Sequence, residues 1–200
     1  MDSHPKPNAV CSKRDWSLPG DAAWWMFLTA EFLTLCMFFG VYAYMRRGSL
    51  VEFQDAQALL DPRFALVNSL VLITSGYCVA RGVRALAQGR LVSAGPAAKW
   101  VLLAALLGIA FTCIKGTEYA GKYEAGLTLS SGTFWFFYYF LTGFHFLHVL
   151  LGIGFLLWVA YGVRAKVGQN EFLVQAESCA AFWHMLDLVW IVLFPLLYLL

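Results

Sequence analysis

Residues 132–163 read GTFWFFYYFLTGFHFLHVLLGIGFLLWVAYGV and contain no Asp, Glu, Lys or Arg. A helix needs roughly 20 apolar residues to cross the hydrocarbon core of a bilayer, and this stretch is longer than that. It therefore predicts a membrane-spanning helix, and the rest of the chain is interpreted around it.

Four further stretches satisfy the same length and hydropathy requirement. Since unpaired backbone groups are costly in lipid, such segments span as helices and bury their polar backbone internally. We therefore expect an all-α membrane protein, a bundle of five transmembrane helices. With the stretch above, the expected spans are Ala22–Met45, Phe64–Val83, Ala97–Lys115, Gly132–Val163 and Ala176–Leu200.

The composition supports this class of protein. Of the 200 residues, 60% are hydrophobic and only 13% charged, whereas a soluble domain carries about 25% charged residues. The formal net charge of +2 is too small to indicate nucleic acid binding. The five cysteines are scattered without a Cys-x-x-Cys pair, so the sequence predicts neither a disulfide framework nor a zinc site.

The distribution of Lys and Arg predicts an orientation. Nine fall on the side of the N-terminus and five on the other, which together are the 14 in the sequence. The positive-inside rule then places the N-terminus in the cytoplasm and Leu200 at the periplasmic face, although Arg46 and Arg47 argue the other way. We expect residues 1–20 to form a cytoplasmic leader and residues 21–200 the five-helix membrane domain.

Glu31 is an acidic residue within the first apolar span. A charge in mid-membrane is costly, so this carboxyl is expected to be protonated or paired across helices. Three interpretations stay open: a hydrogen bond that pins two helices, a protonatable group on a conduction path, and a contact with lipid or a partner.

Two pairs of polar residues lie three positions apart on later spans, His145 with His148 and His184 with Asp187. This spacing places each pair on one helix face. The histidines predict either hydrogen bonds that tie helices together or, less favoured, ligands for a haem or a metal.

Two smaller features are interpreted structurally. Glu118, three residues after Lys115, is expected to form an exposed ion pair at the membrane interface, with both side chains snorkelling to water. Small residues allow close approach of membrane helices. The positions expected to do so include Gly76, Gly143, Gly152 and Gly154.

Three stretches together resemble subunit III of the haem-copper oxidases. Residues 139–150, YFLTGFHFLHVL, are similar to the Leu-Thr-Gly-Phe-His-x-x-His-Val signature of that family. Residues 182–194, FWHMLDLVWIVLF, look like its final helix, and Asp21 with residues 25–31, WMFLTAE, resembles its opening helix. Weaker family positions are matched by Asn68-Ser69 and Glu118-Tyr119.

This resemblance implies a five-helix member of the family. The short loops and the end of the sequence at Leu199-Leu200 look closest to the NorE-type protein associated with nitric oxide reductase. It implies a subunit with no redox centre, no metal and no cofactor of its own. Glu31 matches the family's intramembrane Glu near a phospholipid cleft, and His145, His148, His184, Asp187 and Glu118 match structural signature positions.

The expected function is that of a non-catalytic accessory subunit in the bacterial inner membrane. Its partners would be a haem-copper catalytic subunit, either subunit I or NorB-like, and that enzyme's cytochrome c or copper-containing subunit. It would stabilise the catalytic subunit and support its proton uptake and turnover. The alternatives are an independent haem or metal redox protein using His145, His148 and His184, and a small proton-coupled carrier centred on Glu31.

Overall fold

The computed structural model describes residues 22–88, 94–166 and 169–200, and every regular element in these ranges is a helix. The expected leader, residues 1–20, and Asp21 lie outside the described residues. Five helices are long and apolar enough to cross a membrane, which confirms the predicted all-α, five-span fold. The orientation of the termini stays a prediction. The helices are α1 (Ala22–Gly48), α2 (Leu50–Ala58), α3 (Pro62–Ala87), α4 (Ala94–Glu124), α5 (Thr133–Lys166) and α6 (Asn170–Tyr198).

The segment between the first two spans contains a short helix, α2, which hydropathy did not predict. It buries Phe53 against Tyr42 and Phe134. α3 then begins at Pro62, and the Asp61 side chain caps it by accepting a hydrogen bond from the backbone N–H of Arg63 at 2.9 Å.

The third and fifth spans are longer than hydropathy alone predicts. α4 continues past Lys115 to Glu124, and α6 begins at Asn170 rather than Ala176. The residues at these ends are polar and lie beyond the hydrocarbon region, but they still favour helical backbone, so the helix continues through them. Lys115 consequently lies inside α4, a turn or more from its end.

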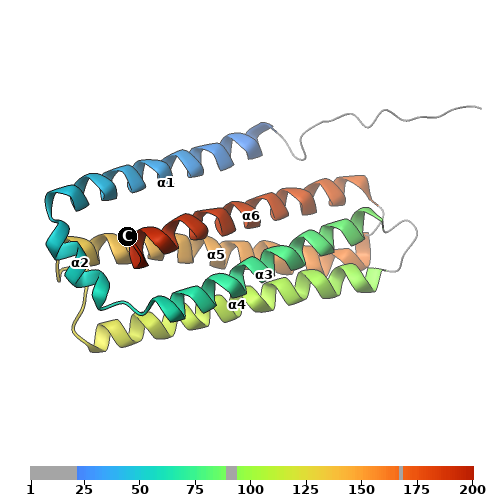
Figure 1. Ribbon diagram of the computed structural model, residues 1–200. Helices are drawn as coiled ribbons and strands as arrows, with labels where there is room; N and C mark the ends of the chain where they lie inside the picture. The colour runs from blue at the N-terminus through green and yellow to red at the C-terminus, as the bar shows by residue number, and fades with distance from the viewer. Residues whose placement is uncertain (1–21, 89–93, 167–168) are drawn as a thin grey trace, which may run out of the picture.

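α1 is the helix least embedded in the bundle. In Figure 1 it lies along one side of the group formed by α3, α4, α5 and α6, above α6. Only 17% of the residues in its 18-residue apolar stretch are buried, against 56% in the corresponding stretch of α6. α6 is therefore the central helix, and α1 is attached through a narrow face.

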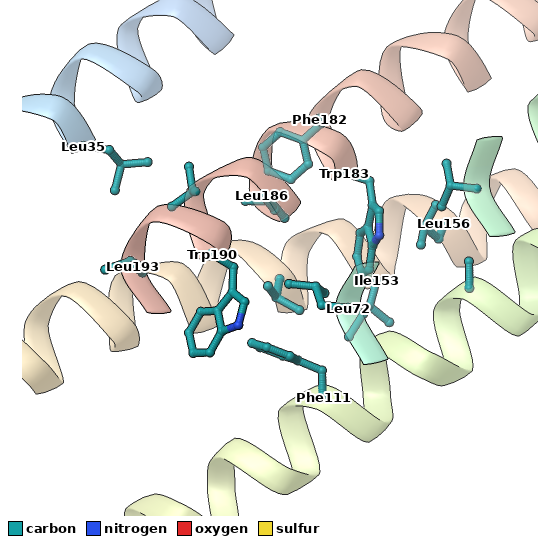
Figure 2. Close-up of a cluster of buried hydrophobic side chains, with 14 of the residues drawn as sticks. Leu35, Leu72, Phe111, Ile153, Leu156, Phe182, Trp183, Leu186, Trp190 and Leu193 are labelled. Carbon is teal, nitrogen blue, oxygen red and sulfur yellow. The ribbon is translucent and has the colours of Figure 1, made fainter. Parts of the chain in front are cut away.

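The core lies between α6 and its neighbours. Figure 2 shows Trp183 and Trp190 projecting from α6 toward Ile153 and Phe111. Phe111 meets the Trp190 ring edge-on, with ring centroids 4.9 Å apart. Both indoles are among the largest fully buried side chains of the described residues. The bundle is thus closed by aromatic rings that one central helix supplies.

Two glycines provide the space for Trp183. A Cβ added to Gly108 of α4 would lie 2.7 Å from the indole, and one added to Gly152 of α5 would lie 2.8 Å from it. The expectation of close packing holds for Gly152 and Gly76 but is wrong for Gly143 and Gly154, where an added Cβ meets nothing within 4 Å.

Candidate functional site

Glu31 meets a partner on another helix. Its Oε2 lies 3.4 Å from Nε2 of His148 on α5, and both side chains are largely buried, 23% and 18% exposed. The other ring nitrogen, Nδ1, lies 2.8 Å from the backbone oxygen of Phe144. Of the two states that the sequence left open for Glu31, the structure has the contact across helices, and it joins α1 to α5.

His145, one helical turn before His148, faces a different part of the bundle. Its ring stacks on Trp190 of α6, with centroids 5.1 Å apart and planes 27° apart, and it meets Phe111 of α4. Neither ring nitrogen has a hydrogen-bond partner among the described residues. His145 therefore contributes ring packing between three helices, rather than the hydrogen bond expected of it.

His184 and Asp187 contact each other along α6. His184 Nδ1 lies 3.5 Å from Asp187 Oδ2, and the His184 side chain is 44% exposed. Asp187 reaches toward α3, because a Cβ placed on Gly76 would overlap its carboxylate. The absence of a side chain at Gly76 thus makes room for a carboxyl group between α6 and α3.

The three histidines do not converge on one point. Each has its own main neighbour, which is Glu31 for His148, Trp190 for His145 and Asp187 for His184. Across 22–88, 94–166 and 169–200, no group of three or more His, Cys, Asp or Glu side chains is placed to hold a metal ion. This geometry favours contacts that join helices over ligation.

The Lys115–Glu118 pair is buried, which makes the expectation of an exposed, snorkelling pair wrong. Lys115 is 1% exposed and Glu118 14%, and their Nζ and Oε2 atoms lie 3.0 Å apart. The hydroxyls of Tyr138 and Tyr198 donate to Glu118 Oε1 at 2.7 and 2.6 Å. Four aromatic rings lie 4.8–5.5 Å from the Lys115 ammonium: Tyr119, Tyr138, Trp190 and Tyr198.

This terminal cluster, defined as Lys115, Glu118, Tyr138 and Tyr198, joins α4, α5 and α6 near one end of the bundle. Tyr198, the last residue of α6, reaches Glu118 of α4 there, and the aromatic rings exclude the water that snorkelling requires. A buried pair is tolerated when additional hydrogen bonds satisfy both charges, as the tyrosines do for the Glu118 carboxylate. The tyrosines lie 20 and 80 positions from Glu118, so no local spacing could reveal the cluster.

The family of the chain follows from its similarity to known protein families. Residues 22–200 match the family described as cytochrome c oxidase subunit III. The chain belongs to this family. The match spans all the helices and every contact described above, so the chain is a multi-pass membrane protein of the subunit III family.

Individual family members differ in how much of their length this subunit III-like chain covers. It is 35% identical over 133 residues to cytochrome c oxidase subunit 3 of Rhipicephalus sanguineus, covering 66% of this chain and 49% of that protein. The cytochrome c oxidase subunit 3 of Triticum aestivum is 31% identical, and the match covers 86% of this chain and 65% of that protein. A probable quinol oxidase subunit 3 of Staphylococcus haemolyticus is 27% identical, with 96% and 94% covered. The chain thus spans about half to two thirds of the cytochrome c oxidase relatives and nearly all of the quinol oxidase relative.

Proposed function

We propose that this chain is a non-catalytic accessory subunit of a haem-copper respiratory complex. It would pack beside the catalytic subunit in the bacterial inner membrane, stabilise it and support its proton uptake and turnover. The observation that carries the proposal is the family match over residues 22–200.

The use of the polar residues supports a role without chemistry of its own. The three histidines considered as ligands each lie against a different side chain of the bundle and do not converge on one point. A metal centre held by several histidines needs their ring nitrogens directed at one ion, which this arrangement does not provide. The alternative function, an independent haem or metal protein, is therefore kept only as the result that would contradict the proposal in the experiment below.

The partner in this proposal is a haem-copper catalytic subunit, either an oxygen-reducing subunit I or a NorB-like nitric oxide reductase. Its cytochrome c or copper-containing subunit would complete the complex. The near full-length match to a probable quinol oxidase subunit 3 supports an oxidase of similarly compact subunits. The NorE-type assignment and denitrification rest on the resemblance of the short loops and stay part of the proposal.

Phospholipid is the proposed ligand of the groove beside α1. A cavity of about 990 Å³ lies there, with apolar walls from α1, α5 and α6 that include Trp24, Phe155 and Val174. Its polar members are all on α6: Asn170, Glu171, Gln175 and Ser178. Apolar walls with a few polar groups suit an acyl chain and the start of a headgroup. Glu31 lies seven positions after Trp24 on α1 and is not among the residues that line this cavity, so its role near a lipid cleft and a proton path stays a proposal.

Deletion of the gene tests the proposal. We expect the partner enzyme to lose assembly, turnover rate or turnover lifetime in membranes, and complementation with the intact gene to restore it. Unchanged assembly, turnover and lifetime would contradict the accessory role. A stoichiometric haem absorption band in the purified chain would instead favour an independent haem protein.

A further inference from the structure

The face by which α1 attaches to the bundle follows a regular spacing. Its buried residues are Leu28, Leu35 and Tyr42, seven positions apart. Glu31 and Phe38 fall between them at alternating steps of three and four, and both are partly buried. This is the spacing of a coiled-coil seam, in which a single polar member is costly and specifies the register of the helices. Glu31 is the acidic member of this seam.

The partner of Glu31 has a defined arrangement of hydrogens. A carbonyl oxygen only accepts hydrogen bonds, so the 2.8 Å contact between His148 Nδ1 and the Phe144 oxygen requires a hydrogen on Nδ1. The remaining nitrogen, Nε2, therefore carries a lone pair in neutral imidazole and a hydrogen in imidazolium. This is the nitrogen that faces the Glu31 carboxyl at 3.4 Å.

The number of protons in this contact follows from the lone pairs. A neutral His148 beside an ionised Glu31 would present lone pair to lone pair, with no hydrogen between them. With both groups protonated, Nε2–H could still donate to the carbonyl oxygen of the acid, but the site would carry a net positive charge in an apolar setting. One proton, on either Nε2 or the carboxyl, gives a hydrogen bond and a pair of zero net charge. In an apolar setting this state costs the least.

The surroundings of the pair are aromatic. The rings of Phe144 and Phe182 lie 4.4 and 6.3 Å from the His148 ring. Three other ionisable groups inside the bundle contact different side chains: His145 lies on Trp190, His184 on Asp187 and Lys115 on Glu118.

We propose that Glu31 and His148 form a single-proton binding site that joins α1 to α5. The pair holds one proton between Nε2 and Oε2, and both side chains are partly exposed at the surface of the bundle. The inference deepens the proposed role of Glu31 in proton uptake. Only the use of this site within a respiratory complex rests on that proposed role. The site itself is tested on this chain alone, so its failure is separate from failure of the accessory-subunit proposal.

Spectroscopy of the full chain in lipid nanodiscs near neutral pH tests the proton count. ¹⁵N NMR of labelled histidine reports whether Nε2 of His148 carries a hydrogen, and infrared spectroscopy with labelled Glu reports whether Glu31 is a neutral acid. The variant His148→Gln assigns the histidine signal, and Glu31→Gln assigns the carboxyl band. We expect one of the two groups to be protonated and not both. A bare Nε2 beside a carboxylate, or imidazolium beside a neutral acid, would overturn the proposal.

The variant Glu31→Gln also tests whether the proton is held by the Glu31–His148 pair. Its carboxamide can donate to the bare Nε2, so we expect His148 in this variant to be neutral with the hydrogen on Nδ1. The matched control is Glu124→Gln, at the exposed end of α4, and it should leave the His148 and Glu31 signals unchanged. An imidazolium signal for His148 that persists in Glu31→Gln would place the proton outside the pair and contradict the proposal.

Discussion

The indole of Trp190 donates a hydrogen bond to the hydroxyl oxygen of Ser69 at 2.9 Å, across 121 positions of sequence. The Ser69 hydroxyl in turn donates to the backbone oxygen of Ala65 at 2.7 Å. The serine therefore accepts from α6 and donates within α3, which satisfies a polar group of the core that would otherwise lack a partner. Two stretches that resemble the family separately are joined by this bond.

Ser69→Ala should destabilise the bundle. The change removes the acceptor of the buried Trp190 N–H, and an unsatisfied buried donor costs about 1–3 kcal/mol. Reversible unfolding of the chain in mixed micelles measures the effect. Ser178→Ala is the matched control, because the Ser178 hydroxyl bonds Val174 of its own helix. Equal unfolding free energies for the two variants would show that the Trp190–Ser69 bond contributes nothing to stability.

Gly152→Ala should destabilise the packing of α5 on α6. The added Cβ would lie 2.8 Å from the Trp183 ring and 3.2 Å from Leu186. Overpacking of this kind costs about 1–3 kcal/mol. Gly154→Ala, two residues along the same helix, adds the same methyl group in open space and should leave the unfolding free energy nearly unchanged. If both variants unfold alike, Trp183 does not lie against Gly152.

Glu118→Gln should destabilise the terminal cluster. It leaves the Lys115 ammonium, 1% exposed, without its carboxylate, and breaking one side of a buried pair costs about 3–5 kcal/mol. The double variant Lys115→Met/Glu118→Gln removes the stranded charge and should recover part of this loss, as a double-mutant cycle of unfolding measures. Additive losses would contradict a direct buried interaction between Lys115 and Glu118.

Much of the fold could be predicted from the sequence, because hydropathy over about 20 residues depends only on local composition. The ends of the helices could not. Residues after Lys115 are polar, so hydropathy ended the third span there, while backbone hydrogen bonding carried α4 on to Glu124. The same cause led to the wrong environment for Lys115, whose burial depends on rings from α5 and α6.

The candidate site was predictable in its residues but not in its contacts. Glu31 and His148 stood out as polar groups in apolar spans, yet nothing in their spacing joins positions 117 residues apart (148 − 31). Gly108 was missed and Gly154 was wrongly expected to pack closely, because a glycine matters for packing only when a ring such as Trp183 lies opposite it. These features depend on how helices meet, which one sequence does not specify.

Affinity purification of the tagged chain from its native membrane in mild detergent tests the central proposal most directly. Mass spectrometry identifies the proteins that remain bound, and an absorption spectrum reports haem. We predict that a haem-copper catalytic subunit is recovered in a fixed ratio to this chain, and that the haem spectrum disappears when that subunit is removed. Recovery of the chain without a haem-copper subunit, or haem that stays with the isolated chain, would contradict the accessory role.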